Sequence, residues 1–183
     1  MLITSELSAG QQLAVWSGRT WMAGFREKRP VQAELEDAYR SVGIACPTDD
    51  IDELFGLIVA GARRVLSFGA APCPFVHPAE AVLVNCLSAY QSGCDKCGKA
   101  ILGQMLNPAE AFLAMAPVQR WAGKLGAAGW SLSMVTLEQL TGGLDGQAES
   151  STLQPDMRDN LARSRALHVT GSGPLARVLR TWH

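Results

Sequence analysis

Apolar residues recur every three or four positions along most of the first 125 residues, which is the spacing of amphipathic helices. The strongest apolar stripe follows a turn at residues 46–50 and predicts a helix over residues 51–66. The positions expected to face inward along it are Ile51, Leu54, Phe55, Ile58, Val59, Ala62, Val65 and Leu66. A second stripe predicts a surface helix over residues 31–43.

The first segment has a less regular pattern. Apolar residues fill much of 7–26, but Ser17 and Gly18 interrupt them. The segment therefore fits either a hairpin or one irregular helix. We favour the helix.

Prolines divide the middle of the chain. Three prolines within seven residues exclude a helix over residues 69–78 and predict an extended segment. Helices are predicted over residues 78–91 and 94–105. A further helix begins at residue 108, and Pro117 either kinks it or opens another helix that reaches residue 125.

The last third of the chain is more polar. Residues 130–140 fit a short helix or an extended piece, and residues 141–155 form a polar loop. A helical segment is expected over residues 156–183. Together these patterns predict an all-α fold, a single globular domain over residues 1–183 with about seven to nine helices arranged as antiparallel hairpins.

One short phrase occurs twice. His77-Pro-Ala-Glu80 returns as Asn107-Pro-Ala-Glu110, and both copies precede a predicted helix. Proline suits the first helical position, and a glutamate at the third can bond back to the N-cap residue. Asparagine is a good N-cap and histidine a poor one, so the second copy predicts a helix start more firmly.

Composition and charge restrict the classes of function. The chain has 183 residues, a net charge of −1 and only 18% charged residues. This balance gives no global electrostatic argument for binding nucleic acid. The first residues do not resemble a secretory signal, and no apolar run reaches the roughly 20 residues of a membrane span. A cytoplasmic location with reduced thiols is therefore expected, which the odd number of five cysteines also favours.

The main candidate chemistry is a Cys-x-x-Cys pair, Cys94 and Cys97, at the expected start of a helix. Backbone N–H groups and the helix dipole stabilise a thiolate at such a position, and Lys96 and Lys99 add positive charge. Such a pair can cycle between dithiol and disulfide. Cys94 and Cys97 are therefore candidate catalytic residues of a thiol–disulfide oxidoreductase.

This local pattern resembles the alkylhydroperoxidase D family, whose all-helical subunits carry a Cys-x-x-Cys pair at a helix start. The family also has an upstream glutamate and a histidine shortly after the second cysteine. The resemblance covers residues 80–101, where Cys94 and Cys97 match the pair and Glu80 takes the place of the glutamate. It implies thiol-peroxidase activity. Ile101 stands where the family has its proton-relay histidine, so that relay is missing here.

Metal binding is an alternative use of the same cysteines. A structural zinc or iron–sulfur site needs four ligands, and Cys86 is the residue that a helical hairpin would bring back toward Cys94 and Cys97. A helix over residues 78–91 would keep Cys73 and His77 roughly 20 Å from the pair at 1.5 Å per residue. No cofactor is otherwise predicted.

The remaining hypothesis is a non-enzymatic helical interaction or scaffold protein that associates with itself or with a protein partner. It depends on the low content of charged residues and on the five tryptophans, a residue type frequent at interfaces. The sequence contains no Walker loop, nucleophile elbow or dinucleotide-binding fingerprint. Those classes of enzyme are therefore not predicted.

Overall fold

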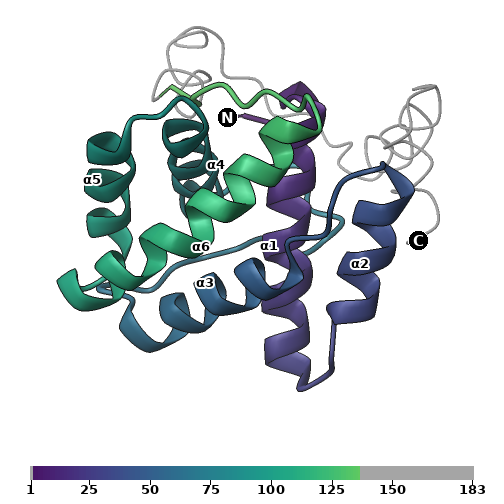
Figure 1. Cartoon of the computed structure of the whole chain (residues 1–183). Helices are drawn as coiled ribbons and strands as arrows, with labels where there is room; N and C mark the ends of the chain where they lie inside the picture. Colours follow the sequence, from purple (N-terminus) through teal and green to yellow (C-terminus); the bar gives the residue numbers. More distant parts are fainter. Residues whose placement is uncertain (1, 137–183) are drawn as a thin grey trace, which may run out of the picture. The chain divides into compact units, whose positions relative to one another are not determined.

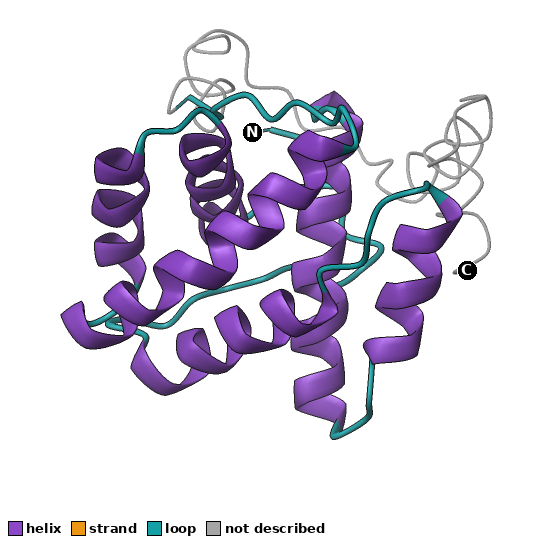
Figure 2. Cartoon of the chain, in the orientation of Figure 1, coloured by secondary structure: helices purple, strands orange, loops and turns teal. Residues whose placement is uncertain are grey.

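The computed structural model describes residues 2–136, which contain six α-helices, one 3-10 turn and no strand (Figures 1 and 2). The elements are η1 (Thr4–Glu6), α1 (Ala9–Glu27), α2 (Gln32–Ser41), α3 (Thr48–Gly61), α4 (Pro78–Gln91), α5 (Asp95–Met105) and α6 (Pro108–Ala127). The all-helical class is confirmed for this part of the chain, with fewer helices than predicted. The loop expected at 141–155 and the helical segment expected at 156–183 lie outside the described residues. Within the described range, no helix has the length and apolarity needed to cross a membrane.

The ambiguous first segment forms the single helix α1 rather than a hairpin. Ser17 fits inside this helix because its hydroxyl bonds the Leu13 carbonyl oxygen of the preceding turn at 2.8 Å. The same hydroxyl lies 3.0 Å from the Tyr39 hydroxyl of α2, which also accepts a hydrogen bond from Trp121 of α6. The polar interruption in the sequence pattern is therefore a buried junction between three helices.

The prediction for the strongest helix was wrong at its C-terminal end. Helix α3 ends at Gly61, and Val65 beyond it is 95% exposed instead of facing inward. Val59, also expected inside, is 43% exposed. At this point the Glu110 side chain lies so close that a Cβ atom at Gly61 would overlap it, and the Gly61 carbonyl accepts a hydrogen bond from Asn107 N–H at 2.9 Å. These contacts come from α6, so the local apolar pattern could not reveal them.

Pairing of helices follows the predicted hairpins only in part. Helices α4 and α5 are neighbours in sequence and lie side by side (Figure 1). Helix α3, in contrast, packs along α6, where Asp50 bonds Lys124 at 2.7 Å and also pairs with Arg120. Helix α6 continues through Pro117 as one helix, which excludes a separate helix opening at this proline.

The two copies of the repeated phrase both begin helices, but only the first is capped as predicted. In the first copy the Glu80 carboxylate accepts a hydrogen bond from His77 N–H at 2.9 Å, as expected. In the second copy the Asn107 side chain makes no capping hydrogen bond. Its backbone N–H instead donates to the Gly61 carbonyl of α3. The copy with the better N-cap residue is therefore the one held by a tertiary contact.

A buried ion pair joins α1 to the start of α4. Arg19 and Glu80 are 2% and 0% exposed, and two N–H groups of the guanidinium donate to the two carboxylate oxygens at 2.8 Å each. Glu80 also accepts from the backbone N–H of Gly69 at 2.8 Å. Arg19 further donates to backbone carbonyls of the proline-rich loop before α4, namely Ala70, Cys73 and Phe75. This loop, predicted to be extended, is therefore fixed by an ion pair that the sequence pattern does not show.

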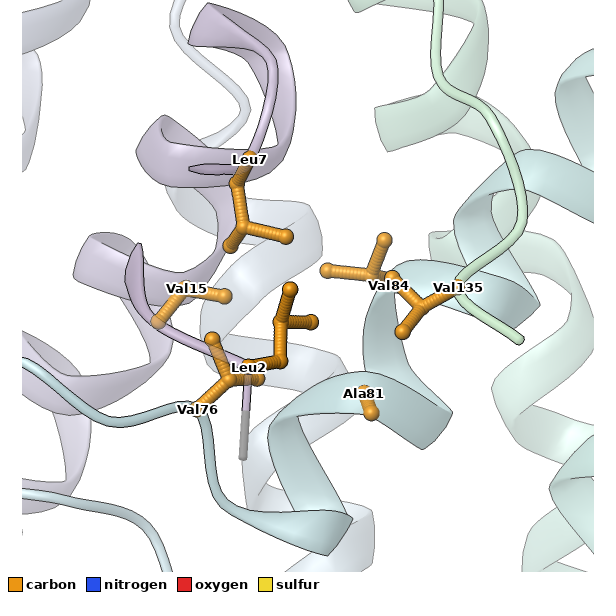
Figure 3. Packing of buried hydrophobic residues seen from close by; sticks show 7 residues of the cluster. All are labelled: Leu2, Leu7, Val15, Val76, Ala81, Val84 and Val135. Atoms are coloured by element: carbon orange, nitrogen blue, oxygen red, sulfur yellow. The ribbon is translucent and has the colours of Figure 1, made fainter. Parts of the chain in front are cut away.

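The segment after α6 is extended over residues 130–136 and lies across α1 and α4. Its backbone bonds to side-chain amides: Asn85 accepts from Val135 N–H at 2.6 Å and donates to the carbonyl of the same residue at 2.9 Å. The Gln91 side chain likewise accepts a hydrogen bond from Leu132 N–H and donates one to the Trp130 carbonyl. Figure 3 shows the Val135 side chain in a buried apolar cluster with residues of α1, α4 and the N-terminus. The other members are Leu2, Leu7, Val15, Val76, Ala81 and Val84.

Replacing Arg19 by methionine (Arg19→Met) leaves the Glu80 carboxylate buried without its partner. We expect a loss of about 3–5 kcal/mol in the free energy of unfolding, measured by urea denaturation. The matched control is Arg40→Met, because Arg40 is 70% exposed and its pair with Asp37 lies at the surface. That variant should change stability by less than about 0.5 kcal/mol. Equal effects of the two substitutions would contradict a structural role for the buried pair.

Candidate functional site

The paired cysteines lie at the turn between α4 and α5. Helix α4 ends at Gln91, and Gly93 follows with a φ of 77°, a left-handed conformation that suits glycine. The chain then reverses so that Cys94 becomes the N-cap residue of α5, held by a 2.9 Å hydrogen bond from its N–H to the Ala89 carbonyl. The sequence prediction of a Cys-x-x-Cys pair at a helix start is therefore confirmed.

Cys94 and Cys97 are joined by a disulfide, so the expectation of reduced thiols is wrong for this pair, and their Cα atoms lie 5.3 Å apart. Cys97 is exposed and Cys94 is half-buried, so solvent reaches this end of the hairpin. Lys96 and Lys99 are exposed on the same first turns of α5, where Asp95 adds one negative charge. The backbone N–H groups of the first turn of a helix have no intrahelical partner. They favour negative charge at the helix start, where Cys94 is the N-cap residue.

Tyr90 and Gly98 hold α5 against α4 beneath the disulfide. A side chain at Gly98 would overlap the Tyr90 ring, so the close approach of the two helices depends on this glycine. The Tyr90 hydroxyl is buried and has no hydrogen-bond partner among the residues that the structure describes. Burial raises the pKa of Tyr90 to about 12, and the neighbouring Cys86 and Asp95 contribute in the same direction. This contact was not predicted from the sequence, where a glycine inside a helical pattern was the available signal.

Cys86 returns to α5 as the hairpin prediction required, but it is not placed as a metal ligand. Its sulfur lies 3.8 Å from the Gly98 carbonyl oxygen, and burial raises the pKa of its thiol to about 12. The sulfurs of Cys94 and Cys97 are bonded to each other. Across residues 2–136, no three His, Cys, Asp or Glu side chains are grouped so that they could hold a metal ion. The geometry therefore gives the zinc or iron–sulfur alternative no support, and it stays a hypothesis.

Glu80 does not lie beside the cysteine pair. It occupies the first turn of α4, and about eleven residues of helix, roughly 17 Å, separate it from the C-terminal end of α4. Its carboxylate is fully buried against Arg19. Cys73 and His77 also lie near this far end, as expected. Ile101, in the position of the family's histidine, is half-buried in α5. Of the residues that carry the resemblance to the alkylhydroperoxidase D family, only Cys94 and Cys97 meet.

No family model, curated protein or solved structure matches this chain. The local resemblance of residues 80–101 is thus not accompanied by a match to a family model. A functional assignment has to rest on the geometry of the chain's own residues.

Replacing Gly98 by alanine (Gly98→Ala) should push α5 away from Tyr90 and lower the free energy of unfolding by roughly 1–3 kcal/mol. The matched control is Gly103→Ala in the same helix, because nothing lies within 4 Å of a Cβ atom added there. Alanine favours helix, so that control should gain up to about 1 kcal/mol. Thermal and urea denaturation of both variants measure the difference. A Gly98→Ala variant as stable as the control would show that the two helices do not depend on this contact.

Proposed function

We propose that the chain exchanges thiols and disulfides with a protein partner through Cys94 and Cys97. The observation that carries this proposal is a solvent-reachable disulfide at the N-terminus of a helix. Structural disulfides typically resist reduction, whereas exposed ones are more easily reduced and include the labile, regulatory and catalytic class. Exposed residues flank the pair, and they leave room for a partner of protein size: Ser92, Gly93, Asp95, Lys96, Lys99 and Ala100.

The exchange starts on the more exposed sulfur. A thiolate of the partner attacks Cys97 Sγ, the bond between the two cysteines breaks, and Cys94 leaves as a thiolate at the N-cap position. A second thiolate of the partner then attacks the partner sulfur that is bonded to Cys97, and Cys97 is released as a thiolate. The protons released by the partner's two thiols end on Cys94 and Cys97. Two electrons have then passed from the partner dithiol to the chain.

Thiol–disulfide exchange fits these residues better than peroxidase activity. Reduction of a peroxide needs a proton for the departing oxygen, which general acid catalysis supplies. Ile101 cannot supply it. Exchange between thiolates and disulfides breaks and forms only sulfur–sulfur bonds, and its rate depends on thiolate content, leaving group and access. The helix start favours Cys94 as a thiolate and leaving group, and the exposure of Cys97 gives a partner access to its sulfur.

The interaction hypothesis stays a prediction, with less support than the sequence gave it. Three of the five tryptophans are buried, with Trp16, Trp21 and Trp121 at most 8% exposed, and they fill the core. They are therefore not available at an interface. Phe112 and Leu113 of α6 are 66% and 55% exposed and form the apolar surface where self-association would be sought first.

After reduction, Cys94 should react with iodoacetamide at neutral pH roughly tenfold or more faster than Cys46 and Cys86. The physical reason is that the helix start favours the Cys94 thiolate, while burial raises the pKa of both other thiols. Peptide mass spectrometry of timed samples measures each rate.

Two controls complete this alkylation experiment. When the reductant is replaced by oxidised glutathione, which accepts the two electrons, the Cys94–Cys97 link should form again, and Cys94→Ser should prevent it without a large loss of helix content. Rates for Cys94 no higher than for Cys46 and Cys86 would refute the redox proposal. Zinc bound stoichiometrically to the reduced protein would favour the metal alternative instead.

Closure of the mixed disulfide by Cys94 can be tested with oxidised glutathione. In the reduced Cys94→Ser variant, Cys97 should keep a stable glutathione adduct, because no thiolate remains to displace it. The reduced wild type should instead release the adduct and form the Cys94–Cys97 disulfide. Peptide mass spectrometry separates these products. A stable adduct of equal yield on the wild-type pair would contradict the role of Cys94 as the resolving thiolate.

A further inference from the structure

A second thiol site lies at the opposite end of α4, where Cys73 meets His77. Their Sγ and Nε2 atoms are 3.7 Å apart, a hydrogen-bonding distance for sulfur. Both side chains are half-buried. The residues around Cys73, at positions 71, 72, 74 and 75, are exposed, so small molecules can reach its thiol. The exchange proposed for Cys94 and Cys97 uses neither residue.

The buried ion pair holds the two residues in this arrangement. Arg19 donates a 2.6 Å hydrogen bond to the Cys73 carbonyl, and Glu80 accepts one of 2.9 Å from His77 N–H. The Cys73 N–H is bonded to the Ala70 carbonyl at 2.9 Å. The backbone of both residues is therefore tied to one buried pair of charges, and the distance between thiol and imidazole does not depend on a free loop.

We propose that Cys73 is a nucleophilic thiol, activated by His77, that forms mixed disulfides with small disulfides such as oxidised glutathione. A nucleophile and a base within hydrogen-bonding reach are the elements of an activated cysteine. With its Nε2 atom unprotonated, His77 takes the thiol proton, and the thiolate attacks one sulfur of the small disulfide. The sulfur–sulfur bond of that molecule breaks. One half stays on Cys73, and the other leaves as a thiolate and takes the proton back from His77.

Cys46 provides an internal comparison. It is also half-buried, but its sulfur lies beside the Thr48 hydroxyl and not beside an imidazole. Burial raises the pKa of the Cys46 thiol. Cys73 differs from it by the imidazole and also by the Phe75 carbonyl oxygen, which lies 3.7 Å from the Cys73 sulfur, so the comparison ranks the two thiols and a substitution of His77 isolates the imidazole.

The experiment uses the full chain with its Cys94–Cys97 disulfide intact, so that Cys46, Cys73 and Cys86 are the free thiols. The protein is incubated with oxidised glutathione at neutral pH, and the adduct on each cysteine is followed by peptide mass spectrometry. Cys73 should gain glutathione about tenfold faster than Cys46, the order of effect of a histidine beside a thiol. Equal rates for these two cysteines would overturn the proposal, and this comparison needs no variant.

The variant His77→Asn then tests the imidazole itself. It converts the start of α4 into Asn-Pro-Ala-Glu, the phrase that already begins α6 at Asn107, and it keeps the backbone N–H that bonds Glu80. The Cys73 rate should fall about tenfold, while the Cys46 rate and the helix content stay unchanged. An unchanged Cys73 rate would overturn the role of His77. Equal slowing of Cys73 and Cys46 would also do so, because it would point to a general effect on the protein.

Discussion

The buried pair of Arg19 and Glu80 is the constraint on which the other features depend. Moving two charges out of water costs several kcal/mol for each ion, and only complete hydrogen bonding offsets that cost. Here the carboxylate is bonded by the guanidinium and by two backbone N–H groups, and the guanidinium reaches three loop carbonyls as well. The pair thereby fixes helix α1, the loop and the first turn of α4 to one another. Helix α4 in turn carries a sulfur site near each of its ends.

Sequence patterns predicted the elements whose ends are set locally. Helix α4 runs from Pro78 to Gln91 as expected, because a proline begins it and a glycine turn ends it. The helix predicted for α3 was too long, because its apolar stripe continues past Gly61, whereas the Gly61 carbonyl bonds Asn107 N–H at the start of α6. Pairing of α3 with α6 joins residues about 70 positions apart. A pattern read over one or two helical turns holds no information about such contacts.

The candidate sites show the same division. A turn followed by Cys-x-x-Cys was sufficient to place Cys94 at a helix start, and the hairpin brought Cys86 back to α5. Glu80 was expected to cap a helix or to stand in for a family carboxylate. In the structure its carboxylate makes the capping bond to His77 and also pairs with the buried Arg19, which lies 61 residues away in the sequence. The approach of Cys73 to His77 was not predictable. It occurs in a proline-rich segment without periodicity, and its geometry comes from Arg19.

The extended segment over residues 130–136 is recognised largely through its main chain. Asn85 and Gln91 present side-chain amides that copy the peptide group, so each pairs with the segment as a neighbouring strand would. Such recognition is indifferent to the identity of the outward-facing side chains and depends on backbone spacing. Those exposed positions are free to diverge in sequence, whereas inserting or deleting one residue would shift the register and turn Leu132 and Val135 away from the core.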